Sequence, residues 1–266
     1  MILRRALADR RRWLLGWSLG ILGLVVLELA FYPTLHDKSA DIAKTLDTLP
    51  KGVRSLFGMA DGIDAFGPVG YLSSRVFALI VPLLLLIAAI GMAAGLAGDE
   101  ERGLLETQYS LPVTRRQLVA ERAGALALLT GELCLVTFVG VWLMARIVGM
   151  GIGVGAVWWA SVSAALLTWA VAAVTLAVAA VTGRRGVAIA VASAVAVLMY
   201  VVTGLADAGI GFFHAIRAAS LFTHYDVLHS LQHGSPPWSL FVLVGVAVVG
   251  LAAALWGIDR RDLRAG

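Results

Sequence analysis

Residues 156–181 read AVWWASVSAALLTWAVAAVTLAVAAV, an apolar run that contains no Asp, Glu, Lys or Arg. A helix that crosses the hydrocarbon core of a bilayer needs about 20 such residues in a row. Over the whole chain, 60% of the residues are hydrophobic and 14% are charged, whereas a soluble domain has about 45–50% apolar and about 25% charged residues. Lipid must therefore solvate most of the chain. Because backbone groups in lipid need internal hydrogen bonds, we predict an all-α polytopic membrane protein.

Five other apolar runs have a similar length and composition, so the sequence predicts six transmembrane helices within one transmembrane domain, residues 1–266. The predicted spans are residues 13–33, 72–97, 123–147, 156–181, 187–206 and 237–257. The first run follows an arginine-rich N-terminus and superficially resembles a signal peptide. It is too long for the apolar core of a signal peptide, and no small-residue cleavage site follows it, so we predict that this helix is retained.

Basic residues predict the orientation of the spans. Most of the 21 Lys and Arg residues lie in the N-terminal tail, in the connections after the second and fourth predicted spans, and in the C-terminal tail. By the positive-inside rule, these segments and both termini are cytoplasmic. The net charge of +4 therefore reflects membrane topology, and we expect no nucleic-acid partner. High usage of Ala, Val, Gly and Arg indicates a GC-rich bacterial genome, so the expected location is a bacterial plasma membrane.

Two long connections, residues 34–71 and 207–236, are predicted to be external. In the first, apolar residues recur at three- and four-residue spacing, which predicts an amphipathic helix on the outer membrane surface. These residues are Ile42, Leu46, Leu49, Val53 and Leu56. Between the third and fourth spans, alternating glycines predict a tight turn. They are Gly149, Gly151, Gly153 and Gly155.

The cytoplasmic connection after the second span, residues 98–117, reads GDEERGLLETQYSLPVTRRQ. Acidic residues come first, and a short apolar stretch that fits a surface helix ends before Pro112. Thr114 and Gln117 match a capping box that starts the helix of the third span. A short helix held between two spans is suited to transmit force from a soluble motor protein, although a solvated loop has the same composition.

This connection resembles the acidic connection in permease subunits of the type 2 ABC exporter family. In that family an acid-rich turn, a Gly-Leu-Leu-Glu-Thr-like helix and a Leu-Pro-x-x-Arg tail follow the second of six spans. The matching residues are Glu100, Glu101, Arg102, Gly103, Leu105, Glu106, Thr107, Leu111, Pro112 and Arg116. The resemblance implies that they form a short coupling helix and its contact with a separate ABC-type ATPase subunit. It also implies that two permeases, identical or related, assemble with two ATPases. Gln108 and Tyr109 depart from the pattern, where an apolar pair is commoner.

The chain has no phosphate-binding loop of the form G-x-x-x-x-G-K-[ST]. We therefore expect ATP and Mg²⁺ to be bound by the partner ATPase and no cofactor by this chain. The expected function is that of a transport subunit and not of an enzyme. Because the spans offer few charged groups, the expected substrate is amphipathic or apolar, such as a drug, a peptide or a lipid.

Ionisable residues inside spans are costly in lipid and are functional candidates for that reason. Glu28 lies toward the outer end of the first span, and Glu132 lies in the inner half of the third. Both are candidates for a substrate path or for gating. The alternative is a structural pair, for Glu28 with Arg146 at a similar depth. If both acids line a proton path, the chain is instead a transporter driven by an ion gradient.

Four of the five histidines are close together in the last external connection, and His229 and His233 have i,i+4 spacing. That spacing places both imidazoles on one helical face, as a metal ion requires. The H-E-x-x-H pattern is absent, so we favour a polar external helix and assign no metal ligand and no catalytic residue. A membrane-embedded metal or redox enzyme that uses these histidines is the remaining alternative function.

Overall fold

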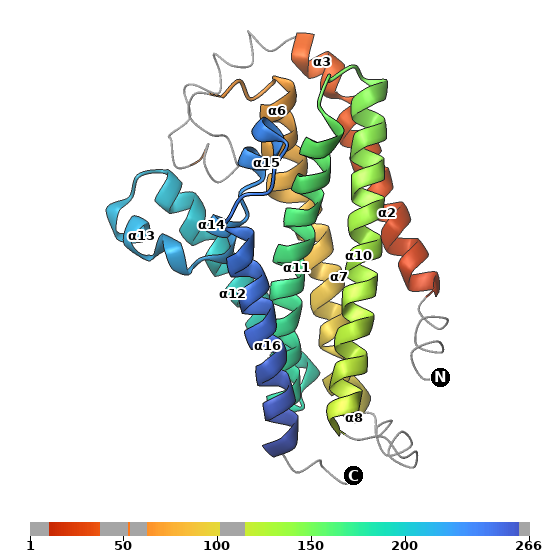
Figure 1. Ribbon diagram of the computed structural model, residues 1–266, viewed down its shortest axis with the longest axis vertical. Coiled ribbons are helices and arrows are strands. Elements are labelled where there is room, and N and C mark those ends of the chain that lie inside the picture. Colours follow the sequence, from red (N-terminus) through yellow and green to blue (C-terminus); the bar gives the residue numbers. More distant parts are fainter. Residues whose placement is uncertain (1–10, 38–52, 54–62, 102–114, 261–266) are drawn as a thin grey trace.

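The structure is a computed structural model that describes residues 11–37, 53, 63–101 and 115–260. Within these ranges the chain forms helices and turns without a strand, and six helices are long and apolar enough to cross a membrane. The prediction of an all-α polytopic membrane protein with six spans is thereby confirmed. Figure 1 shows the membrane-length helices side by side along one long axis.

The second span is assembled from consecutive helical segments, whereas each span from the third to the sixth is one helix. The first span is α2 (Arg11–Ala30) with α3 (Tyr32–Asp37); the second is α6 (Pro68–Tyr71), the π-helix η1 (Leu72–Ile80), α7 (Val81–Ala93) and α8 (Gly95–Glu101); the others are α10 (Arg115–Ile147), α11 (Val154–Thr182), α12 (Arg185–Asp207) and α16 (Leu240–Arg260). Between α12 and α16 lie the short helices α13 (Gly211–Ile216), η2 (Arg217–Ala219), α14 (Leu221–His224) and α15 (Val227–His233).

Two helices extend further toward the acidic connection than hydropathy alone predicts. The second span continues as helix to Glu101, beyond the predicted end at residue 97. The third span begins at Arg115, well before the predicted start at residue 123. Charged residues can continue a helix once it leaves the hydrocarbon, so the end of an apolar run does not mark the end of its helix. We call the end of the bundle where α8 ends and α10 and α12 begin the connection end (Figure 1).

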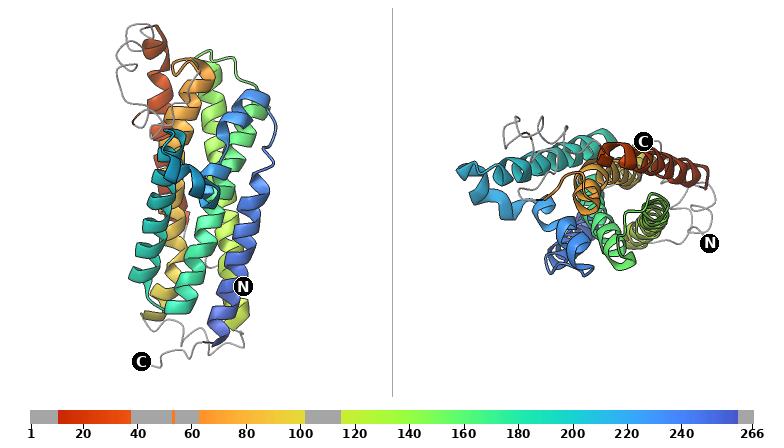
Figure 2. Two further views of the ribbon diagram at one scale, coloured as in Figure 1. Left: turned by 90° about the vertical axis from the view of Figure 1, so that its left-hand side faces the viewer. Right: turned by 90° about the horizontal axis from the view of Figure 1, so that it is seen from above.

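Helix α11 lies at the centre of the bundle, in contact with α7, α10, α12 and α16. The end-on view in Figure 2 shows these helices around it. Its closest neighbour is α16, where glycines seven residues apart allow a close approach. A Cβ atom at Gly250 would lie 2.9 Å from the backbone carbonyl carbon of Ala173, and one at Gly257 would lie 2.5 Å from Cγ2 of Val181.

The connection after the fifth span differs from the single polar helix that the sequence favours, because it folds into the short helices α13 to α15. Figure 1 shows α13 and α14 part of the way along the bundle beside α12, with α15 near α6. Hydroxyl groups fix this segment to the fifth span. Ser220 donates to the carbonyl of Met199 at 2.8 Å, and Thr203 donates to Ser220 at 2.8 Å.

The predicted turn between the third and fourth spans is confirmed. Gly149 and Gly151 have φ values of +71° and +67°, in the left-handed region that favours glycine. The amphipathic helix predicted in the first long connection lies almost wholly outside the described residues, including Ile42, Leu46, Leu49 and Leu56.

Candidate functional site

Asp99 and Arg122 form an ion pair at the connection end, between α8 and α10. Both side chains are largely buried, with 14% of Asp99 and 20% of Arg122 exposed. The pair joins the two helices that flank residues 102–114. Because a charged hydrogen bond with little water around it is stronger than one at the surface, this contact holds the ends of the connection together.

Glu101, the last residue of α8, anchors the same connection to the fifth span. Its carboxylate accepts a hydrogen bond from the backbone N–H of Arg185, the first residue of α12, at 2.9 Å. The first N–H groups of a helix have no partner within the helix and carry partial positive charge, so a carboxylate there is favourable. Gly98 makes room for this contact, since a Cβ atom there would lie 2.8 Å from Cδ of Arg185.

Arg116, at the start of α10, reaches the end of the sixth span. Its guanidinium group contacts Asp259 at 2.6 and 2.7 Å. The arginine side chain is 74% exposed, so water screens the pair and its contribution to stability is small. Next to it, the guanidinium of Arg260 lies over the ring of Trp256, 4.2 Å from the ring centroid.

These contacts join the two helices that flank the connection to each other and to one end of two other spans, the fifth and the sixth. Of the sequence-predicted coupling residues, Glu100 and Glu101 lie on α8, and Arg116 lies on α10. The remaining ones lie outside the described residues. They are Arg102, Gly103, Leu105, Glu106, Thr107, Leu111 and Pro112.

Sequence reasoning missed the partners of the coupling residues. Arg122 is one of the basic residues that predict the orientation of the spans, and Asp259 lies in a different span. One feature of the sequence could have indicated the Asp99–Arg122 pair: acidic residues lie before the connection, and basic residues lie after it at the start of the third span. Nothing in the sequence pointed to the backbone of Arg185 as the partner of Glu101.

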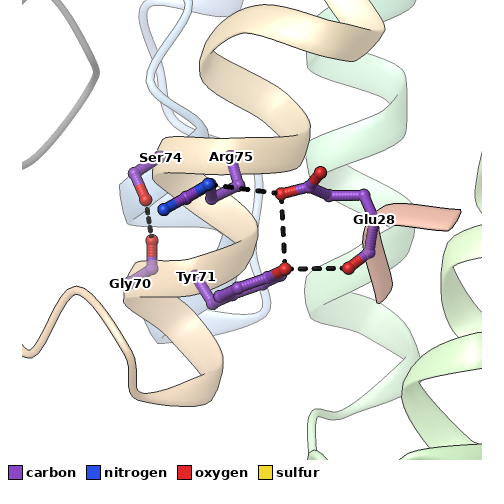
Figure 3. Close-up of polar contacts among 5 residues, drawn as sticks. All are labelled: Glu28, Gly70, Tyr71, Ser74 and Arg75. Atoms are coloured by element: carbon purple, nitrogen blue, oxygen red, sulfur yellow. Dashed lines mark hydrogen bonds and ion pairs between the residues drawn. The ribbon is translucent and has the colours of Figure 1, made fainter. Parts of the chain in front are cut away.

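Glu28 belongs to a second polar cluster, with Tyr71 and Arg75 of the second span (Figure 3). The Tyr71 hydroxyl donates to the backbone carbonyl of Glu28 at 2.8 Å and contacts its carboxylate at 3.3 Å. The guanidinium of Arg75 lies 3.8 Å from the same carboxylate. The predicted pair between Glu28 and Arg146 is therefore wrong. Because the second span begins at Pro68, Arg75 reaches the depth of Glu28, while Arg146 lies over the ring of Trp142 at 5.7 Å.

Glu132 is not part of the Glu28 cluster. It lies midway along α10, on an exposed face that also carries Leu128, Leu135 and Val139. Within the described ranges its carboxylate has no hydrogen-bond or ion-pair partner. The structure therefore separates the two acids that the sequence grouped as candidates for a substrate path.

In the connection after the fifth span, His229 and His233 contact each other and the backbone. The rings of His229 and His233 stack with centroids 4.4 Å apart, and Nδ1 of His233 lies 3.1 Å from the carbonyl of His229. Asp226, three residues before His229, instead caps α15 by accepting the N–H of His229 at 3.0 Å. In the part of the chain that the structure describes, no three His, Cys, Asp or Glu side chains gather as a metal site would require.

Six membrane-length helices define a polytopic helical membrane protein. The family described as ABC-2 family transporter protein matches residues 1–263, so the chain belongs to this family. It is accordingly the membrane-spanning permease type of transport subunit and not an enzyme, as predicted. A comparison with curated proteins finds no match.

Proposed function

We propose that this permease is half of the transmembrane part of an ATP-driven exporter, with ATP hydrolysed by separate subunits that contact residues 98–117. The observation that carries this proposal is the set of contacts around the connection. Asp99 on α8 pairs with Arg122 on α10, Glu101 on α8 contacts α12, and Arg116 on α10 contacts α16. A displacement applied to the connection would therefore act on four spans together.

The mechanical argument depends on rigid elements. Energetic coupling over tens of ångströms is carried by helices and by networks of contacts that move as units. Helices α8 and α10 are continuous with the second and third spans. A partner ATPase that closes on ATP would push on the connection and move these helices, and two permeases, identical or related, would open and close a path between them. In this arrangement the connection end is cytoplasmic, ATP and Mg²⁺ are bound by the partner, and the location is a bacterial plasma membrane.

The interior of the bundle supports an amphipathic or apolar substrate. Buried hydroxyl groups on α11 already donate to carbonyls of their own helix, so they offer no free donor to an ion or sugar. Ser161 donates to Val157 at 2.9 Å, Thr168 to Ala164 at 2.7 Å, and Thr175 to Val171 at 2.7 Å. The apolar character of the helices therefore favours a drug, a peptide or a lipid as the transported molecule.

Affinity purification of the tagged chain from its native membrane tests the assembly. We expect a soluble ATPase with a phosphate-binding loop to co-purify with the native chain. With the variant Glu106→Arg, Pro112→Ala, we expect the amount of co-purified ATPase to fall at least ten-fold, because the variant reverses one charge and removes the proline in the segment that we propose contacts the ATPase. Mass spectrometry of the eluate measures the amount of ATPase that is recovered with the native chain and with the variant.

The control is Gln232→Arg on α15, away from the connection end, which should retain the ATPase. If no ATPase co-purifies with a folded, monodisperse native chain, the exporter proposal fails. A proton path through Glu28 and Glu132 would then be the next hypothesis.

A further inference from the structure

The second span contains a backbone carbonyl that its own helix leaves without a donor. In the π-helix η1, each N–H bonds to the carbonyl five residues earlier, and the N–H of Val81 bonds to Val76. The next donor in this register would be residue 82. That residue is Pro82, which has no N–H, so the carbonyl of Phe77 loses its backbone partner.

Tyr225 supplies the missing hydrogen bond. Its hydroxyl donates to the carbonyl oxygen of Phe77 at 2.8 Å, from the turn between α14 and α15. Burial raises the pKa of the Tyr225 phenol well above its ordinary value, so the hydroxyl keeps its proton and remains a donor. A carbonyl without a partner is costly inside a membrane protein, because no water is at hand to replace the bond.

The residues around Tyr225 hold it in place. Ser220 and Thr203 fix the preceding turn to α12, as described above, and Ser239 donates to the carbonyl of His224 at 3.1 Å. Asp226 caps the following helix. The hydroxyl of Tyr225 is therefore presented to the second span by a segment anchored on both sides.

The π register also aligns the two ends of the second span. Tyr71, which begins the π turn, and Arg75, within η1, contact Glu28 on one side (Figure 3). On the other side, α7 and α8 lead to Glu101 at the connection end. If η1 became an α-helix, the segment that follows it, α7 and α8, would rotate about the helix axis relative to the segment that contains Tyr71. The rotation would be about 100°, the angle between successive residues of an α-helix. The contacts of Glu28 and of Glu101 could not both be kept.

We infer that Tyr225 is a positioning residue of the permease. Its hydroxyl replaces the donor that Pro82 lacks, holds the second span in the π register, and so keeps the Glu28 cluster in alignment with the helix that ends at Glu101. The hydrogen bond between Tyr225 and Phe77 does not depend on an ATPase subunit. Its consequence for transport rests on the proposed function.

A double-mutant cycle of Tyr225→Phe and Pro82→Ala tests this inference in the full chain in lipid nanodiscs. Hydrogen–deuterium exchange of the peptides that cover residues 72–81 is the readout. Tyr225→Phe alone removes only the hydroxyl that donates to the carbonyl of Phe77. Exchange of these peptides should become at least ten-fold faster, because the π-helix loses the hydrogen bond that holds its register. In the Pro82→Ala background the same change should alter exchange less than two-fold, because the new N–H at position 82 can donate to the carbonyl of Phe77 in the π register.

Equal effects of Tyr225→Phe in both backgrounds would overturn the inference, as would unchanged exchange in the single variant. A loss of packing alone could not be rescued by a new N–H in another helix. Neither result depends on an ATPase. The double-mutant cycle can therefore contradict the role of Tyr225 while the exporter proposal stands, and the exporter proposal can fail while the cycle supports the role of Tyr225.

The transport consequence has its own measurement, ATP hydrolysis by the permease purified with its ATPase. We expect Tyr225→Phe to lower this rate at least three-fold and Pro82→Ala to restore it in the double variant. If exchange follows the cycle but hydrolysis is the same in all four proteins, the positioning role in transport is wrong.

Discussion

Replacing Arg122 with Ala is expected to destabilise the chain by about 1.5–3 kcal/mol, the usual contribution of a hydrogen bond to a charged group. The change removes the guanidinium group that contacts the partly buried Asp99 carboxylate between α8 and α10. The free energy of unfolding, measured by SDS titration of the purified chain, checks this value. The same variant should lose most of its co-purifying ATPase, because the two helices that flank the connection are no longer held together.

Arg116→Ala is the matched control, since it breaks a neighbouring ion pair whose arginine is 74% exposed. It should leave stability nearly unchanged. The exchange Asp99→Arg, Arg122→Asp restores opposite charges and should recover part of the stability that Arg122→Ala loses. If Arg122→Ala is tolerated as well as Arg116→Ala, the Asp99–Arg122 pair does not hold the connection.

Gly250→Leu is expected to separate the fourth and sixth spans. Even a Cβ atom at this position would lie 2.9 Å from the backbone of Ala173, and a backbone cannot move aside as a flexible side chain can. Overpacking costs on the order of 1–3 kcal/mol in a well-packed core, and a leucine against a backbone should reach the upper part of that range or exceed it. A fall in the melting temperature of the detergent-solubilised chain would register the loss.

Gly245→Leu on the same helix provides the comparison, because a Cβ atom there meets nothing within 4 Å. This variant should melt close to the native chain. A similar loss at both positions would mean that the contact with α11 does not decide the effect, because leucine has a higher helix propensity than glycine and cannot cause a loss in that way.

The sequence predicts the number of spans and the helical class well, because composition determines which solvent each segment can occupy. It predicts the ends of spans poorly. Charged residues such as Asp99 and Glu101 continue α8 beyond the apolar run, and hydropathy has no means to register this. The start of the second span at Pro68 was missed for a related reason, since its first turns contain Tyr71, two serines and Arg75.

Contacts between distant segments were the main omission. Asp259 and Arg185 lie far along the chain from the connection they contact, and no periodicity links them to it. The pair of Glu28 with Arg75 depends on the depth at which two helices meet, which a single sequence does not encode visibly. Pro82 was visible in the sequence, but the π register that makes it important, and the hydroxyl of Tyr225 that compensates for it, emerge only from the fold.

The central claim is that residues 98–117 contact a separate ATPase, and photo-crosslinking in cells tests it most directly. Benzoylphenylalanine is introduced in place of Leu105 in the connection or, as a comparison, of the exposed Gln232 on α15. Irradiation should link the chain covalently to an ATPase with a phosphate-binding loop from position 105 and not from position 232. Adducts without that ATPase at position 105, or equal ATPase adducts at both positions, would contradict the claim.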